Sequence, residues 1–411
     1  MVIRRFMPDN PARRLQPSIL PWGAPFLKRK AYRMTSEERR KRRYHRRILR
    51  RATAKAQRIA DYDSFDKVFT FDHLYAAYRE ARKGVTWKAS TQRYISQAPL
   101  RIEATRHELM DGTFRSTGFY EFDLIERGKP RHIRSVSFNE RVVQRCLCDN
   151  ALVPVLKRTF IYDNGAYLSR KGYHFAIRRL QAHLRKYYSV YGANGYILLF
   201  DFSKFFDRVS HRLIEGILRK QFTDERIISL VLYFVDAFGE VGLGLGSQVS
   251  QILALASANR LDHFVKETLR IRYYGRYMDD GYLIHSDKRY LQTCLARIRF
   301  ICSELGIVLN EKKTRIVKLS HGFSYLKVRF FLLPSGRIIR KLAPYSTTRI
   351  RRRLKKLRAF VENGLLCMDD LRASWQSWRA YAQNFNSHRS VRAIDKLYAR
   401  QIQILNEGGY L

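Results

Sequence analysis

The stretch that decides the fold is Arg276-Tyr277-Met278-Asp279-Asp280-Gly281-Tyr282-Leu283-Ile284-His285-Ser286 (RYMDDGYLIHS), in which two adjacent aspartates separate two runs typical of β-strands. Adjacent carboxylates repel each other, so the pair is either a solvated turn or a site for a bound cation. A second Met-Asp-Asp, at 368–370, has no flanking strand patterns. There we expect the carboxylates to serve the N-terminus of a helix.

A third aspartate closes the apolar run Tyr196-Ile197-Leu198-Leu199-Phe200, which predicts a short buried strand. Burying an unpaired charge is expensive, so Asp201 at the end of this strand is not there for packing. If the strand lies beside the strands that meet at Asp279 and Asp280, three carboxylates converge and need cations. Such oxygen ligands suit Mg²⁺ together with substrate phosphates, and two ions roughly 3.5–4 Å apart promote in-line phosphoryl transfer.

The charge balance predicts a polyanionic partner. The 411 residues include 79 lysines and arginines against 36 aspartates and glutamates, a formal net charge of +43, and 45% are hydrophobic, enough for real cores. Phosphate contacts make nucleic acid the leading partner, and with three carboxylates this predicts a polymerase or a nuclease. An anionic membrane surface is the alternative, but no apolar run approaches the ~20 residues that span a bilayer. We find no secretory signal pattern behind Met1.

The order of elements around the aspartates predicts an α+β layer. The pattern gives a strand at 196–200, helical spacing at 213–218, two strands within 276–286, an amphipathic helix at 291–305 ended by Gly306, and a strand at 307–309. This order is typical of an antiparallel sheet with helices on one face. The five cysteines form no CxxC pair, so we expect buried thiols and neither zinc nor disulfides.

Both ends of the chain are basic. Five prolines between Pro8 and Pro25 break up the first half of a basic arm that reaches about Asp61, and Thr35-Ser36-Glu37-Glu38 predicts a capping box that opens a helix. From about Arg337 a second basic segment has helical spacing. We expect the cations of both segments to contact RNA or DNA phosphates, with solvated helix faces as the alternative. They are Arg39, Arg40, Lys41, Arg42, Arg43, Arg46, Arg47, Arg351, Arg352, Arg353, Lys355 and Lys356.

Four motifs, in this order over roughly residues 70–385, resemble those of the bacterial reverse transcriptases. They are Asp201 to Phe206 (D-x-x-x-F-F), residues 276–280 (Y-x-D-D), Asn310 to Thr314 (N-x-x-K-T) and Gly322 to Leu326 (G-F-x-F-L, the primer grip). The resemblance implies a right-hand polymerase of the α+β class. Its parts are a basic arm and helix at 1–61, fingers at 62–195, a palm at 196–335 with a finger/palm connection at 225–270, and a basic helical thumb at 336–411.

The resemblance also implies how DNA is made on an RNA template. Asp201 and Asp279 would bridge two Mg²⁺ ions, with Mn²⁺ as the alternative, and the backbone carbonyl of Phe202 would be a further ligand. Asp280 would be a supporting carboxylate. Lys313 would give a proton to the leaving pyrophosphate, although Lys312 beside it is an alternative donor.

Further residues are implied in nucleotide binding. Phe206 would lie under the sugar and reject a 2′-hydroxyl, which favours dNTPs. Lys129, Arg131 and Arg134, on a polar hairpin at 126–134, would hold the triphosphate, with a solvated loop as the alternative.

Residues 246–251 depart from the family pattern G-x-x-x-S-P, because Gln251 replaces proline. The S-Q form resembles the reverse transcriptases of diversity-generating retroelements, and Gln251 could relax the nucleotide pocket. The Arg-rich arm is unusual for that group, and Lys327 stands where glycine usually follows G-F-x-F-L. Both leave open an antiphage-defence enzyme that copies a noncoding RNA.

The implied partners are a template or noncoding RNA, a primer, the cDNA product and dNTPs in the bacterial cytoplasm, with no membrane. A small accessory protein or a homo-oligomer is left open. A noncatalytic RNA-binding scaffold is the alternative from another class, but it would have no reason to keep Asp201, Asp279 and Asp280. An RNA polymerase of similar fold is the third, and Phe206 disfavours it.

Overall fold

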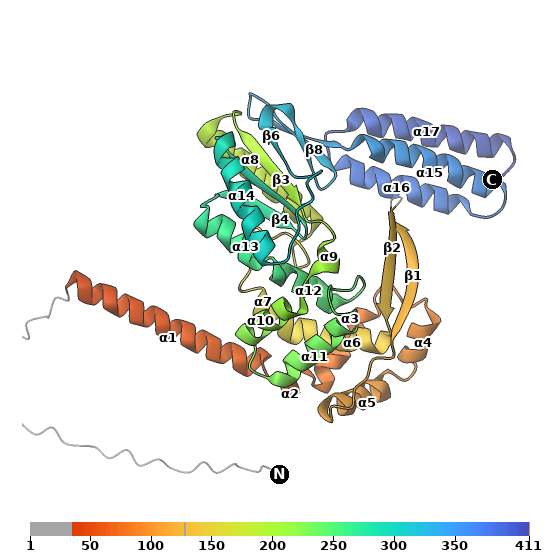
Figure 1. Ribbon diagram of the computed structural model, residues 1–411. Helices are drawn as coiled ribbons and strands as arrows, with labels where there is room; N and C mark the ends of the chain where they lie inside the picture. Colours follow the sequence, from red (N-terminus) through yellow and green to blue (C-terminus); the bar gives the residue numbers. More distant parts are fainter. Residues whose placement is uncertain (1–34, 127–128, 411) are drawn as a thin grey trace, which may run out of the picture. The chain divides into compact units, whose positions relative to one another are not determined.

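The computed structural model describes residues 35–126 and 129–410, and the chain divides into two compact units, one ending at Ala54 and one beginning at Lys55. Figure 1 shows helix α1 (Ser36–Tyr62), which supplies the described part of the first unit. The predicted capping box is confirmed, since Glu38 N–H donates to Thr35 Oγ1 (3.2 Å) and Thr35 N–H donates to Glu38 Oε2 (2.7 Å). The predicted irregular arm, residues 1–34, lies outside the described residues.

The second unit begins with a helical region and an antiparallel ribbon. Strands β1 (Phe119–Glu126) and β2 (Lys129–Val136) pair along their whole length, which confirms the hairpin expected at 126–134 and extends it. The helices of this region are α2 (Phe65–Val68), α3 (Phe71–Ala81), α4 (Ala89–Ile95), α5 (Ala98–Met110), α6 (Phe138–Leu147), α7 (Val153–Leu156), α10 (His211–Gln221), α11 (Glu225–Asp236), α12 (Gln248–Ser257) and α13 (Asn259–His263).

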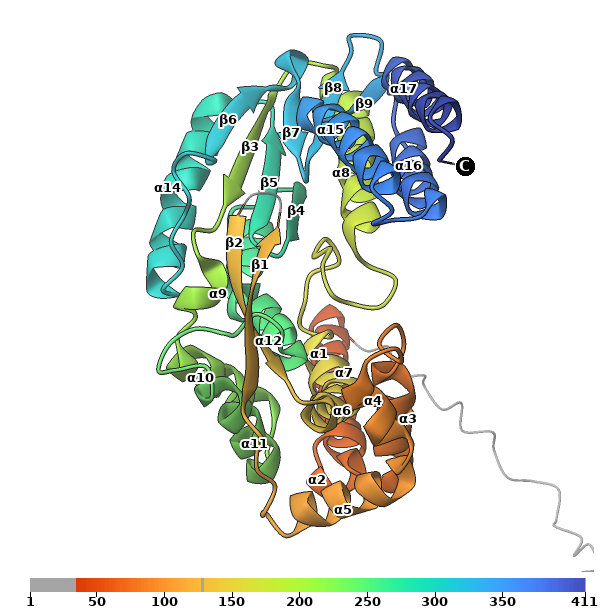
Figure 2. The ribbon, with the colours of Figure 1, turned by 90° about the vertical axis from the view of Figure 1, so that its right-hand side faces the viewer.

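A four-stranded sheet with the order β4-β5-β3-β6 forms the centre of the second unit (Figure 2). Its strands are β3 (Tyr196–Asp201), β4 (Tyr273–Tyr277), β5 (Asp280–His285) and β6 (Arg315–Lys318), and all neighbouring pairs are antiparallel. The strand ending at Asp201 therefore lies directly beside the second strand of the RYMDD hairpin. The α+β class and the antiparallel sheet are confirmed.

Helices cover both faces of this sheet, so the expectation that they lie on one face is wrong. Leu198 and Phe200 of β3 pack in one core with helix α14 (Lys288–Glu304). Ile197 and Leu199 point the other way and pack in a second core with helix α8 (Tyr173–Tyr191). Because alternate residues of a strand face opposite sides, the continuous apolar run of β3 is the pattern of a strand buried on both faces.

The strand predicted at 307–309 is also wrong in detail. Helix α14 ends as predicted, with Gly306 in the left-handed region (φ 69°), but only Leu309 then forms an isolated bridge, to Phe202. The edge strand that pairs with β3 is β6, a few residues further along the chain.

The C-terminal part joins a small sheet to three helices. Strands β7 (Phe323–Tyr325), β8 (Val328–Leu332) and β9 (Ile338–Leu342) form an antiparallel sheet, so the segment predicted to be helical from about Arg337 begins with a strand. Helices α15 (Pro344–Glu362), α16 (Met368–Gln383) and α17 (His388–Glu407) follow and pack on one another.

Two further observations concern the cysteine side chains and the length of the apolar helices. Cys146, Cys148, Cys294 and Cys302 are buried free thiols, as expected, and Cys367 is exposed. Within residues 35–126 and 129–410, no helix is long and apolar enough to cross a membrane.

Candidate active site

The three predicted aspartates meet at one end of the central sheet. Asp201 pairs with Asp280 across β3 and β5, and Tyr277 pairs with Asp280 across β4 and β5, so Asp279 lies in the two-residue turn between them. The turn is fixed to the end of β3 because Phe202 N–H donates to the carbonyl of Asp279 (3.1 Å). All three carboxylates line a cavity of about 1510 Å³.

The crowding of the carboxylates shifts the pKa of one of them, Asp280. Asp201 is only 4% exposed. Burial first, and then the negative charges of Asp279 and Asp201, raise the pKa of Asp280 to about 7. Three carboxylates at this spacing therefore do not all stay ionised near neutral pH unless positive charge is supplied.

Lys313 supplies one such charge within the chain. Its Nζ lies 2.6 Å from Asp201 Oδ2, and Asn310 Nδ2 donates to Asp201 Oδ1 (3.3 Å). Burial alone would lower the pKa of Lys313, but the ion pair with Asp201 raises it above its usual value. Lys313 therefore carries a proton at the end of β3, and its role as a proton donor stays a prediction.

A buried ion pair between Arg276 and Asp262 stabilises the turn that contains Asp279. Arg276, 1% exposed, donates through Nε and Nη2 to the two carboxylate oxygens of Asp262 (2.8 and 2.7 Å). Its Nη1 donates to the carbonyl of Met278 (2.7 Å), and Met278 has a left-handed backbone (φ 52°). Tyr274 donates its hydroxyl to the same Asp262 (2.6 Å). A non-glycine residue in this conformation is strained, so Arg276 fixes the turn that presents Asp279.

The other side of the hairpin is held through the backbone. Arg276 N–H donates to the carbonyl of Asp163 (3.2 Å), and Gly165 N–H donates to the carbonyl of Arg276 (2.8 Å). The Asp163 carboxylate is itself buried between Arg179 and Lys266. Asn164 therefore forms an isolated parallel bridge with Arg276 at the edge of β4.

The donor set fits a divalent cation. Among the described residues, no group of three or more His, Cys, Asp or Glu side chains already has metal-binding geometry. The three carboxylates nevertheless converge as oxygen donors, the type that Mg²⁺ prefers. Burial and the neighbouring negative charges raise the pKa of Asp280, and a bound cation would favour its ionised form.

Two of the predicted nucleotide-binding residues, Phe206 and Arg134, do not line this cavity. Phe206 is half-buried and packs against the core that contains Phe205. Arg134 pairs with Glu121 (3.1 Å) and donates to the carbonyl of Phe238 (3.1 Å). Their roles in nucleotide binding stay predictions.

Three further nucleotide-binding predictions fall on exposed or undescribed side chains. Gln251 is exposed in the first turn of α12. The side chains of Lys129 and Arg131 lie outside the part of the structure that is described, although their backbone belongs to β2. Ile125, which pairs with Pro130 at the same end of the ribbon, does line the cavity.

The predicted nucleic-acid cations of the C-terminal segment lie on α15. Arg352 lines the cavity of the three aspartates together with Arg349, which was not predicted. Arg351, Arg352 and Lys355 also line a groove of about 430 Å³ whose opposite wall is α17, with Lys396 and Arg400. Lys356 lies over the ring of Phe360 (5.2 Å), and Arg353 lines a separate pocket between α15 and α16.

The sequence analysis missed several residues of this region. Asn310 was quoted within a motif but given no role, and its polar side chain beside Lys313 was the available signal. Asp262 gave no signal, because a single aspartate in a helical segment usually faces water. Tyr173, Tyr345 and Tyr381 line the cavity from α8, α15 and α16, and only the fold brings these three helices together.

Comparison with known proteins assigns the class. Residues 125–330, half of the 411-residue chain, match the family described as reverse transcriptase (RNA-dependent DNA polymerase). The chain therefore belongs to the reverse transcriptase family, and it is an RNA-directed DNA polymerase with a right-hand polymerase fold. Enzymes of this family use divalent metal ions and act on RNA and DNA.

One curated relative and two solved structures are similar to this chain. Protein YkfC of Escherichia coli (strain K12) is 24% identical over 300 residues, which cover 62% of this chain and 76% of YkfC. Apo telomerase from Candida tropicalis, truncated from its C-terminal domain, aligns with a TM-score of 0.43 and 12% identity over 59% of this chain and 60% of that one. Telomerase from Candida albicans in complex with a TWJ fragment of telomeric RNA aligns with a TM-score of 0.42 and 12% identity over 69% and 55%. The alignments thus span less than two thirds of either telomerase chain.

Proposed function

We propose that this chain copies a dedicated RNA into cDNA by two-metal-ion nucleotidyl transfer at Asp201, Asp279 and Asp280. The observation that supports this most is the antiparallel register that sets Asp201 opposite Asp280, with Asp279 in the adjoining turn. Two Mg²⁺ ions, when bound, would activate the primer 3′-hydroxyl and stabilise the leaving pyrophosphate. Asp201 and Asp279 would bridge them, with the Phe202 carbonyl as a further ligand and Asp280 as the supporting carboxylate.

The chain's own cations would complete the reaction. Lys313 has a side chain that is 54% exposed, so it can leave Asp201 and give its proton to a pyrophosphate oxygen. Lys129, Arg131 and Arg134 of the ribbon would hold the triphosphate, and Phe206 would exclude a 2′-hydroxyl. Arg349 and Arg352, which line the same cavity, would contact the nucleic-acid backbone.

Primer extension with Mg²⁺ and dNTPs on an RNA template tests this proposal. The double variant Asp279→Ala, Asp280→Ala should lose extension, whereas Asp369→Ala, Asp370→Ala should keep it. The second variant is a matched control, because it removes the same charges from the other Met-Asp-Asp. Equal product from both variants would contradict the assignment of the site.

For the biological role we propose a diversity-generating retroelement. Its support is Gln251, whose exposed amide lies in the first turn of α12. The start of this helix is fixed by the buried Gln144, whose Oε1 accepts from Ser247 Oγ (3.0 Å) and from Gln248 N–H (3.3 Å). Gln251 does not line the aspartate cavity, so the support for this role is the exposed amide that stands in place of proline at a fixed helix start.

Sequencing the RNA and cDNA that copurify with the protein separates this role from antiphage defence. Errors concentrated at template adenines, reduced in Gln251→Pro, would support the retroelement. A short or repetitive product with few such errors would support the defence role instead. The same preparation, analysed by mass, would reveal a small accessory protein or a homo-oligomer.

A further inference from the structure

One short turn of the chain holds the buried carboxylate of Asp201. Asn310 Nδ2 donates to Asp201 Oδ1 (3.3 Å), and Lys313 Nζ lies 2.6 Å from Asp201 Oδ2. Lys313 N–H also donates to the carbonyl of Asn310 (3.1 Å), so both groups come from the single turn of the N-x-x-K motif. Each oxygen of Asp201 thus has a donor from this turn, one neutral and one charged.

The backbone fixes the place of Asn310 beside the end of strand β3. Asn310 N–H donates to the carbonyl of Asp201 (2.8 Å), and Ser203 N–H donates to the carbonyl of Val308 (2.7 Å). Neither bond uses the side chain of Asn310. A substitution of this side chain should therefore leave the backbone pairing in place and remove only the bond to the carboxylate.

The two donors differ in how easily they can leave Asp201. The Lys313 side chain is 54% exposed, and its long stem reorients readily. Asn310 is half-buried, and its short side chain extends from a backbone that is hydrogen-bonded to Asp201. We therefore expect the ammonium group to move while the amide stays.

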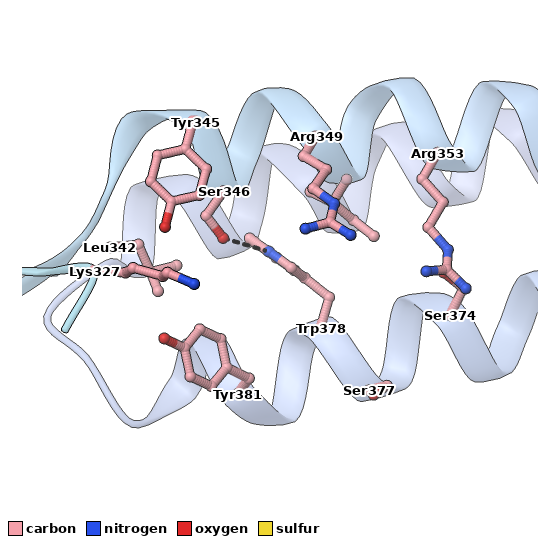
Figure 3. A pocket seen from close by; sticks show the side chains of 11 residues that line it. Lys327, Leu342, Tyr345, Ser346, Arg349, Arg353, Ser374, Ser377, Trp378 and Tyr381 are labelled. Carbon is pink, nitrogen blue, oxygen red and sulfur yellow. Dashed lines mark hydrogen bonds between the residues drawn. The ribbon is translucent and has the colours of Figure 1, made fainter. Parts of the chain in front are cut away.

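The arginines of helix α15 form no ion pair with Asp201 in the described part of the chain. In Figure 3, Arg349 and Arg353 reach from α15 towards α16. Arg349 lines the aspartate cavity as well, but the ion pair of Asp201 is with Lys313. The turn at 310–313 therefore supplies both the neutral and the positive partner of this carboxylate.

We propose that Asn310 is a positioning residue for Asp201, whose carboxylate it keeps directed into the cavity when Lys313 has left. The inference rests on the proposed function, because it takes Asp201 to be a metal ligand. Carboxylates that bind metals are oriented by hydrogen bonds from neighbouring groups, and loss of such a partner typically weakens metal binding about 10–100-fold. Lys313 should have the opposite effect, since its ammonium group competes with a metal ion for the same carboxylate.

Manganese binding without nucleic acid or dNTPs tests this assignment. The 411-residue chain is titrated with Mn²⁺ near neutral pH, and free Mn²⁺ is measured by electron paramagnetic resonance. Asn310→Ala should weaken binding about 10–100-fold, whereas Lys313→Met should tighten it, because a competing positive charge is removed. Unchanged binding in Asn310→Ala, or a change of the same sign in both variants, would overturn the proposal.

Two controls separate positioning from general charge and from folding. Glu311→Gln changes the charge of the same turn, but Glu311 belongs to an exposed ion pair with Arg299, so Mn²⁺ affinity should change by less than about twofold. A loss as large as that in Asn310→Ala would overturn the proposal. Asn310→Ala should unfold in a single transition by circular dichroism. If it does not fold, Asn310→Ser repeats the test, because its side chain is polar but too short to reach the carboxylate.

The variant Asp279→Ala separates this inference from the proposed function. If it binds Mn²⁺ as tightly as the wild type does, the aspartates hold no metal and both proposals fail. If Asp279→Ala weakens binding and Asn310→Ala does not, only the inference fails. If Mn²⁺ binding responds as expected but the wild type extends no primer, Asn310 keeps its role and the proposed function fails.

Discussion

The chain contains Met-Asp-Asp twice, and the two copies differ in secondary structure, burial and electrostatic surroundings. Asp279 and Asp280 lie between two paired strands, and burial with neighbouring charges raises the pKa of Asp280 to about 7. Asp369 and Asp370 open helix α16, where Asp369 has a side chain that is 84% exposed and Asp370 Oδ2 accepts the N–H of Cys367 (3.2 Å). The first pair is partly buried and lies beside a third carboxylate, that of Asp201, whereas the second is solvated and favoured by the helix N-terminus. The same three residues therefore have different chemical properties, which depend on the strands or helices that surround them.

The largest expected difference between the copies is in activity. Asp279→Asn removes a proposed metal ligand with little change in volume, so kcat should fall about 1,000-fold or more. Asp369→Asn should change kcat by less than about twofold, because an exposed surface carboxylate contributes little. Single-turnover primer extension measures both, and a similar loss in the two variants would remove the distinction.

The next difference is in stability. Arg276→Met leaves Asp262 as an unpaired buried charge, which should lower the free energy of unfolding by about 3–5 kcal/mol. At the second copy, Arg372→Met removes only an exposed ion pair with Asp369 and should change the free energy by less than about 1 kcal/mol. Urea unfolding followed by circular dichroism compares the two variants. Equal losses would mean that the buried pair does not hold the first turn.

The stability of the strands around the first Met-Asp-Asp should also depend on pH, because the buried His183 contacts strand β5. His183 is 2% exposed and hydrogen-bonds the hydroxyl of Tyr282 in β5 (2.9 Å), and burial lowers its pKa to about 4. Because the unfolded histidine titrates near its ordinary value, its contribution is present above about pH 6.5 and is lost as the pH falls towards about 4.

His183 therefore contributes about 3 kcal/mol to the free energy of unfolding, from the difference between its ordinary pKa and its lowered pKa of about 4. His183→Gln should therefore lose less unfolding free energy than the wild type between pH 6.5 and 4. The comparison is made by urea titrations at several pH values. Parallel pH profiles for the two proteins would show that His183 is not held neutral.

The smallest effect belongs to the second copy alone. Asp370→Ala removes the capping interaction at Cys367 and should lower the free energy of unfolding by about 1 kcal/mol, with kcat unchanged. Thermal unfolding together with primer extension checks both halves. A large loss of activity would mean that this helix start contributes to the active site.

The sequence predicted the elements that carry local signals. The apolar run before Asp201, the hairpin at Asp279 and Asp280, the helix stopped by Gly306 and the capping box at Thr35 were all visible as short patterns, and the structure contains each of them. Their signals depend on neighbouring residues only, so no tertiary information was needed.

The features that the sequence did not predict depend on packing between residues that are far apart in the chain. Helix α8 covers the second face of the sheet, and the spacing of its apolar residues does not tell which face of the sheet the helix contacts. Asp262 became part of the site only because α13 brings it beneath Arg276. Phe206 and Gln251 were assigned by motif, but they lie outside the cavity lining, where position along the chain gives no distance to the aspartates.

The ion pair between Lys313 and Asp201 has a consequence for how the protein is made and kept. An ammonium group 2.6 Å from the most buried of the three carboxylates acts as an internal counter-ion, so the chain can fold and be stored before any metal arrives. Chelators should then switch the enzyme off without melting it, and adding metal back should restore it without refolding. If the proposed metal ions bind here, they would replace the Lys313 ammonium as the counter-ion of Asp201.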